Sequence, residues 1–274
     1  MNKNPQQASQ KSPFAKHPSD KGTATCRIET RDCGGEVAWI EVAHKGKMNA
    51  IGSAMIDALL TIFAELKTHQ TLRVVVITGG GQHAFVGGAF LPELDGLTPK
   101  TGREFITRLH LACQAVRDCP VPVIAQMRGH CLGAGVELAA SCDFRIADRS
   151  VIYGMPEVKV GLPSVIEAAL LPLLIGWGKT RKMLLSGANY DADEGKTMGF
   201  INTLAEAGEI DQAVALRIDQ IMAAGPLAVR AQKQLINTWE SMTPDEGISL
   251  GIDYLAAAYE TDEPQRMMAP LLKK

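Results

Sequence analysis

Residues 72–78, LRVVVIT, most strongly limit the folds open to this chain. A run so rich in β-branched side chains is typical of a parallel strand that is buried on both faces. Such a strand needs other elements packed on each side, which favours an α/β core. The pattern around it predicts further strands at 26–30, 37–42, 122–127, 144–147 and 151–153, and helices at 53–67, 102–117 and 133–141.

The chain after residue 161 is expected to be mainly helical. Two segments, Ser164 to Glu167 and Thr243 to Glu246, match the capping-box pattern that starts a helix. Helices are predicted near 178–185, 209–223 and 226–239. The domain organisation that follows is a disordered tail at 1–25, an α/β core at 26–200 and a helical region at 201–274.

Charge, hydropathy and cysteine usage argue against several kinds of partner. The net charge is −2 and the pI is about 6.3, so the basic patch typical of nucleic-acid binding is not expected. No apolar run reaches the roughly 18 residues that cross a bilayer. The six cysteines form no C-x-x-C and no zinc spacing, which predicts buried free thiols, a reducing cytoplasm and no metal site.

The segment 129–147, GHCLGAGVELAASCDFRIA, raises the first question of function. Glu137 stands in an otherwise apolar run, and glutamate is rarely buried unless it is paired or used. The small residues Gly133, Ala134 and Gly135 begin the predicted helix and leave its first backbone N–H groups uncovered. Together they indicate a site that binds negative charge beside a carboxylate.

A second loop of small residues, at 84–94, also follows a predicted core strand. Small side chains allow a ligand to approach the backbone closely. Each loop alone is explained equally well by close packing. Because both follow core strands, their joint occurrence favours an oxyanion hole, a pair of N–H groups that binds a developing oxyanion.

Four segments, taken in order, make the chain resemble the crotonase superfamily, the enoyl-CoA hydratase/isomerase group. They are KMNA at 47–50, AFVGGAFL at 84–91, GHCLGAGVELAASCD at 129–143 and GMPEVKVGL at 154–162. The resemblance implies a spiral of ββα units with a C-terminal helical region that builds trimers or dimers of trimers. It also implies an acyl-CoA thioester substrate and no cofactor other than the coenzyme A of that substrate.

The resemblance also assigns the site residues. The oxyanion hole matches the backbone N–H groups of Ala89 and Ala134, and the two glutamates that hold the water in hydratases match Glu137 and Glu157. Substrate-binding positions match six further residues: Lys47, Met48, Ala50, Gly87, Phe90 and Leu91. Two carboxylates beside one water can divide the roles of acid and base, which favours enoyl-CoA hydration.

Two departures from the family pattern concern the acyl group. Phe90 stands where many members carry aspartate, and it is expected to line the acyl pocket. The usual glycine-rich loop is replaced by LPSVIEA at 162–168, where the capping-box pattern explains Glu167 better than a third catalytic acid does. The alternatives left open are an enoyl-CoA isomerase, an acyl-CoA hydrolase, and a non-catalytic RNA-binding or scaffolding member.

The C-terminal sequence predicts self-association. Apolar side chains between Leu250 and Tyr259 occupy more than one side of the expected helix, so more than one side must be covered. The family packs this region between subunits. We therefore expect a homotrimer or a dimer of trimers, with residues 267–274 near a neighbour's coenzyme A site.

Overall fold

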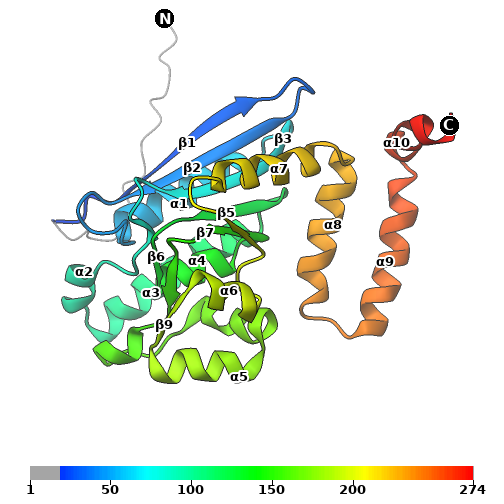
Figure 1. Cartoon of the computed structure of the whole chain (residues 1–274). Coiled ribbons are helices and arrows are strands. Elements are labelled where there is room, and N and C mark those ends of the chain that lie inside the picture. Colours follow the sequence, from blue (N-terminus) through cyan, green and yellow to red (C-terminus); the bar gives the residue numbers. More distant parts are fainter. Residues whose placement is uncertain (1–18, 274) are drawn as a thin grey trace, which may run out of the picture.

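The computed structural model describes residues 19–273, and a six-stranded sheet forms its centre (Figure 1). The strand order is β1-β2-β3-β5-β7-β10. Its members are β1 (Thr23–Thr30), β2 (Glu36–Ala43), β3 (Leu72–Gly79), β5 (Val123–Met127), β7 (Phe144–Asp148) and β10 (Thr203–Ala205). The pair β1 and β2 is antiparallel, and every other neighbouring pair is parallel. The prediction of a buried parallel strand at 72–78 is therefore confirmed.

Alternate side chains of β3 enter two separate apolar layers. Val74 and Val76 pack with α7 (Ile210–Met222), whereas Val75 and Ile77 belong to the larger core with α1 (Ser53–Leu66) and α3 (Pro99–Arg117). Because strand side chains alternate between faces, a strand covered on both sides must be apolar at nearly every position. This is the physical reason for the LRVVVIT sequence.

A second sheet of four short strands places the functional loops. It contains β4 (Ala84–Val86), β6 (His130–Leu132), β8 (Ile152–Gly154) and β9 (Asn189–Asp191), in that order. The strands β4, β6 and β8 are parallel neighbours, and they follow β3, β5 and β7 along the chain. The carboxyl ends of parallel strands meet at one edge of a sheet, so the loops after β4, β6 and β8 gather there.

Short helices follow these loops and complete the core. They are α2 (Leu91–Asp95), α4 (Ala134–Ala140), the 3₁₀ helices η1 (Glu157–Val160) and η2 (Ile166–Leu170), α5 (Leu171–Ser186) and α6 (Ala192–Met198). The expected helix at 178–185 is the second half of α5, which is kinked at Gly176. The segment η2 packs against both α3 and α4.

The last three helices lie at one side of the molecule, where α8 contacts the body and α9 and α10 lie beyond it (Figure 1). They are α8 (Pro226–Trp239), α9 (Pro244–Ala258) and α10 (Glu263–Leu272). The predicted capping box at the start of α9 is confirmed, since the side chains of Thr243 and Glu246 each bond the other's backbone N–H. The main contacts of α9 are with α8.

The other predicted capping box is wrong. Ser164 does not cap a helix, because its hydroxyl donates to Glu157 Oε2 at 2.8 Å and η2 begins at Ile166 with Val165 as its N-cap. Glu167 is therefore free of the helix-capping role that the sequence pattern assigned to it. Its side chain is buried instead.

The structure describes only residues 19–25 of the amino-terminal segment for which the sequence predicts disorder. Residues 1–18 lie outside the described residues, so the expected disorder there stays a prediction. The strand β1 begins at Thr23 rather than at residue 26. Asp20 accepts hydrogen bonds from the backbone N–H groups of Gly22 and Ala54, which ties this segment to the start of α1.

Within residues 19–273, none of the helices is both long and apolar enough to cross a membrane. The four cysteines at 113, 119, 131 and 142 are buried and free, as predicted, while those at 26 and 33 are exposed.

Candidate active site

The loops after β4 and β6 bring the two expected oxyanion-hole residues together. A β-carbon on Gly133 would lie 3.8 Å from the Cα of Gly88, and 2.5 Å from Oε1 of Glu157. Gly88 and Gly133 have φ angles of 119° and 51°, which glycine adopts readily. Ala89 and Ala134, the residues that follow them, have no hydrogen-bond partner for their backbone N–H groups among residues 19–273.

The first of these loops is braced by Asn49. Its side-chain amide donates to the backbone oxygens of Gly80 and Ala84, at 3.0 and 2.9 Å, and its Oδ1 accepts from the backbone N–H of His44. The buried Asn49 has a φ of 54°, an uncommon left-handed conformation that asparagine tolerates better than most residues. This brace ties the turn at 44–50 to the strand that leads into the oxyanion loop.

Glu137 lies in the first turn of α4 and is only 4% exposed. The pKa of its carboxyl is raised to about 9, mainly by burial and in smaller part by the nearby carboxylates of Glu157 and Glu167, while the Ala168 backbone N–H acts in the opposite direction. A carboxyl with this pKa holds its proton at neutral pH. The unliganded site therefore contains a buried neutral acid.

Glu157 begins the 3₁₀ helix η1 after β8 and is half-buried. Its Oε1 lies beside Gly133, and its Oε2 accepts the hydroxyl hydrogen bond of Ser164. The hydrogen bond fixes the direction of the carboxyl group. The site thus combines a neutral acid with a second, differently held carboxylate.

The six expected substrate-binding positions differ in exposure. Lys47, Met48 and Leu91 are exposed, whereas Ala50 is buried and Gly87 is partly covered. Gly87 donates its backbone N–H to the backbone oxygen of Met48 at 2.7 Å, which packs the turn at 44–50 against the oxyanion loop. Phe90 is 1% exposed, and its ring lies 4.7 Å from that of His44.

A basic hollow lies beside this turn. It has a volume of about 650 Å³ and is lined by Ser19, Lys21, His44, Lys45 and Lys47. The lysines are donors suited to phosphate groups.

Two residues near the site were not predicted from the sequence as functional. Glu167 is 5% exposed and receives His110 Nδ1 at 2.7 Å on its Oε1. The only sequence signal was a glutamate in an apolar segment, the same signal that drew attention to Glu137, and the spacing from Ser164 gave it a different explanation. His110 carried no signal, because its partner is 57 residues away.

Comparison with known proteins agrees with this geometry. A family model described as Enoyl-CoA hydratase/isomerase matches residues 32–270. The Short-chain-enoyl-CoA hydratase of Clostridium acetobutylicum is 27% identical over 88% of this chain and 92% of its own length. The Crotonyl-CoA hydratase of Syntrophomonas wolfei is 29% identical over 87% of this chain and 92% of its own length. The crystal structure of an enoyl-CoA hydratase from Bacillus anthracis matches with a TM-score of 0.85 and 25% identity, over 90% of this chain and 96% of that chain.

The chain belongs to the enoyl-CoA hydratase/isomerase family and has the crotonase fold. The family and the fold class that the sequence predicted are confirmed. The family acts on acyl-CoA substrates.

Proposed function

We propose that this protein is an enoyl-CoA hydratase that adds water across the α,β double bond of an acyl-CoA thioester. The observation that carries the proposal is the position of Glu157, whose Oε1 lies beside Gly133 of the oxyanion loop and whose charge acts on the buried acid Glu137. The naming of similar proteins as hydratases supports the same reaction.

The two backbone N–H groups act on the thioester oxygen. Attack of water at the β-carbon moves the double-bond electrons toward that oxygen and creates an enolate. The N–H groups of Ala89 and Ala134 donate hydrogen bonds to it and stabilise its negative charge. Removal of one donor of this kind typically costs about 10²–10³ in rate.

The two glutamates divide the proton transfers. Glu157, held by Ser164, accepts the proton from the attacking water as its oxygen bonds the β-carbon. Glu137, which holds a proton at neutral pH, delivers it to the α-carbon. Proton exchange between the two carboxyl groups then restores the starting state, so the net reaction adds one water and consumes no proton.

The coenzyme A portion is proposed to bind at the basic hollow. Lys21, Lys45 and Lys47 line it, close to the turn that contacts the oxyanion loop. Their charges suit the phosphate groups of coenzyme A. Phe90, buried against His44 of the same turn, is proposed to line the pocket for the acyl group.

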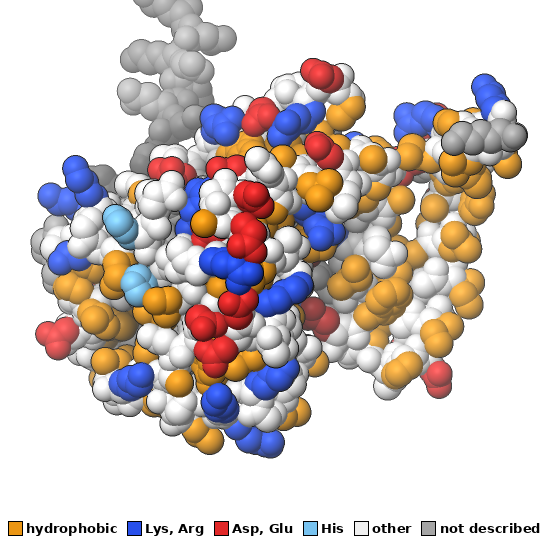
Figure 2. Space-filling view, viewed as in Figure 1, with side chains coloured by type: hydrophobic (Ala, Val, Ile, Leu, Met, Phe, Trp, Pro, Cys, Tyr) orange, Lys and Arg blue, Asp and Glu red, His pale blue; other side chains and the backbone are white. Residues whose placement is uncertain are grey.

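The exposed apolar arm supports self-association. The helix α9 has Gly247 as its one buried residue, although Ile248, Ile252 and Leu255 are each about two-thirds exposed. Figure 2 shows hydrophobic side chains along this arm. We propose that copies of the chain cover it in a trimer or a dimer of trimers. The expected position of residues 267–274 near a neighbour's site remains a proposal, and Lys274 lies outside the described residues.

The test is a spectrophotometric screen of enoyl-CoA thioesters that differ in chain length and branching. We expect loss of the conjugated double bond, a 3-hydroxyacyl-CoA product, and a fall in kcat of at least about 10²-fold for both Glu137→Gln and Glu157→Gln. The matched control Glu65→Gln changes an exposed glutamate of α1 and leaves kcat unchanged. A shifted double bond or released coenzyme A as the main product would instead assign the isomerase or the hydrolase reaction.

A further inference from the structure

A pair formed by buried Glu167 and half-exposed His110, outside the two proposed catalytic glutamates, lies where η2 packs against α3 and α4. Glu167 Oε1 is 2.7 Å from Nδ1 of His110, whose side chain is 44% exposed. Glu167 Oε2 is buried and has no hydrogen-bond partner among the described residues. A buried carboxylate oxygen left unpaired is costly, so its position calls for an explanation beyond packing.

The backbone that carries Glu167 is strained. Ile166 has a φ of 40°, which is a genuine outlier for a β-branched residue. Backbone strain of this kind concentrates at functional sites. The strained residue lies between Ser164 and Glu167 in the chain. Ser164 hydrogen-bonds Glu157, and the charge of Glu167 acts on Glu137, so one short segment influences both proposed catalytic glutamates.

The pair also connects the interior to the surface. A hollow of about 250 Å³ is lined by His110, Glu167 and their neighbours Gln114, Arg117, Ile166, Ala169 and Leu170. Its lining shares no residue with the basic hollow at which coenzyme A is proposed to bind.

We propose that Glu167, held by His110, is a positioning residue that controls the protonation of Glu137 from the η2 side of the site. The proposal rests on the assignment of Glu137 as the proton-carrying acid. His110 holds the Glu167 carboxyl group in place through its hydrogen bond, and the charge on Glu167 helps to hold the proton on Glu137.

The other charged and titratable groups of the elements packed against Glu167 include Cys113 and Arg117 on α3 and Glu137 on α4. On α3, burial keeps the Cys113 thiol protonated by raising its pKa, and the Arg117 guanidinium is paired with Glu240 at 2.5 Å. On α4 the facing group is Glu137 itself, and Glu157 of η1 lies beyond it. Of these groups only Arg117 is a cation, and its charge is paired with Glu240.

The test uses His110, because a half-exposed side chain can be replaced with little risk to the fold. His110→Phe removes the N–H donor that holds the Glu167 carboxyl group in place, so the charge of Glu167 acts less strongly on Glu137. We expect the pKa of Glu137 to fall by at least about 0.5 unit. Glu167→Gln should shift it in the same direction, and His110→Gln, which keeps an N–H donor, should shift it less.

The pKa of Glu137 can be read without substrate. The difference in thermal stability between each protein and its Glu137→Gln derivative changes with pH until the native pKa of Glu137 is passed. In the His110→Phe background this change should end at a lower pH than in the parent. The alkaline limb of kcat/KM with an enoyl-CoA substrate should move in parallel.

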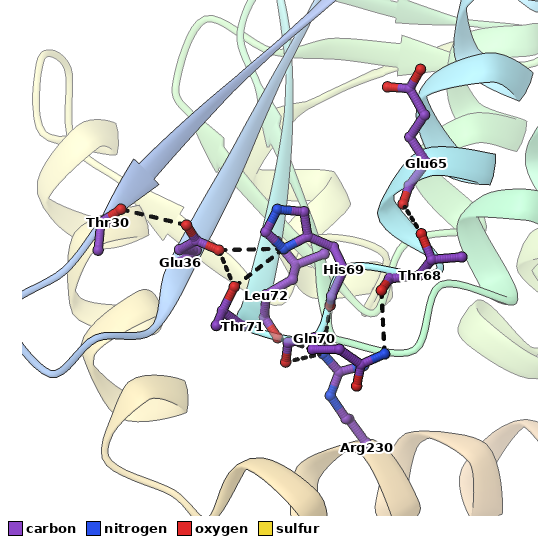
Figure 3. Close-up of polar contacts among 9 residues, drawn as sticks. All are labelled: Thr30, Glu36, Glu65, Thr68, His69, Gln70, Thr71, Leu72 and Arg230. Atoms are coloured by element: carbon purple, nitrogen blue, oxygen red, sulfur yellow. Dashed lines mark hydrogen bonds and ion pairs between the residues drawn. The ribbon is translucent and has the colours of Figure 1, made fainter.

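A similar histidine outside the site provides the control. His69 is 36% exposed and its Nδ1 lies 3.3 Å from Glu36 Oε2, and Figure 3 shows its ring joined to both Glu36 and Thr71. His69→Phe should leave both readouts unchanged. An unchanged end point in the His110→Phe background would overturn the proposal. If the end point moves in a protein that does not hydrate enoyl-CoA, the pair controls Glu137 as proposed and only the hydratase assignment fails.

Discussion

At the scale of the residue, Gly133 both adopts a backbone conformation that favours glycine and lies against a proposed catalytic side chain. Its φ of 51° favours glycine, and the space that a side chain would occupy holds Oε1 of Glu157. Gly34 has a similar positive φ of 77° but open space around it. The two glycines therefore share a backbone requirement and differ in what lies beside them.

This difference predicts contrasting effects of substitution by alanine. Gly133→Ala and Gly34→Ala should each lose about 1–2 kcal/mol of stability, because both place a β-carbon in the left-handed region. Only Gly133→Ala displaces Glu157, and its kcat should fall by at least about tenfold. Thermal unfolding and steady-state kinetics on both variants provide the measurement. Equal kcat values would remove Glu157 from the proposed position of the base.

Glu137 predicts a dependence of stability on pH. Its pKa is raised from 4.5 to about 9 in the folded protein, so the folded state holds a proton that the unfolded chain releases above pH 4.5. Stability contributed by this group therefore falls as pH rises from 4.5 to about 9, by at most about 1.4 kcal/mol per pH unit. Below 4.5 the group is protonated in both states and makes no difference.

Glu137→Gln removes this titration. The variant should gain thermal stability relative to the parent as pH rises through the same window, and the two should differ least near pH 4. Thermal midpoints at fixed protein concentration between pH 4 and 9 provide the measurement. A constant difference across this range would show that Glu137 ionises normally.

At the scale of the element, one sequence pattern has two outcomes. Ser164 and Thr243 are each followed three residues later by glutamate. Thr243 caps α9, where Pro244 and the apolar residues that follow continue the helix. Ser164 precedes a strained turn, and Glu157, seven residues back in the chain, supplies a better partner for its hydroxyl. Spacing alone does not contain that tertiary contact.

The two hydroxyl groups should therefore respond differently to removal. Thr243→Ala should cost about 1 kcal/mol of stability and leave kcat unchanged. Ser164→Ala should lower kcat by up to about tenfold, since it loses one hydrogen bond to Glu157, with a smaller effect on the helices. Thermal unfolding and kinetics on both variants separate these roles. A kcat loss in Thr243→Ala alone would contradict the assignment.

Long elements with regular patterns could be predicted from the sequence, and short ones could not. The strand β3 and the helix α8 were located within one residue, because a β-branched run and a helical period are visible over many residues. The strands β4 and β6 have three residues each, too few for a periodicity to show, although they set the edge where the site forms. The family resemblance supplied the residues on that edge, while the Glu167–His110 pair depends on packing between distant segments.

At the scale of the whole molecule, the described chain leaves an unusual amount of apolar surface on one arm. An apolar hollow of about 740 Å³ lies between α8, α9 and α10, lined by Leu227, Leu250, Tyr254, Met267 and Met268 among others. The opposite positions of α9 are exposed as well. Contiguous apolar surface of this extent marks an interaction site in most proteins.

The assembly prediction can be tested by charge placed on α9. The parent should sediment at micromolar concentration with three or six times the monomer mass of 29.4 kDa. Leu255→Glu places a charge on the exposed apolar side of α9 and should shift the chain toward monomer, because burying an unpaired carboxylate at an interface is strongly unfavourable. Leu185→Glu is the matched control, since Leu185 is 80% exposed on α5 and away from this arm. A parent that sediments as a monomer and hydrates enoyl-CoA at full rate would show that the arm is not needed for assembly or for the site.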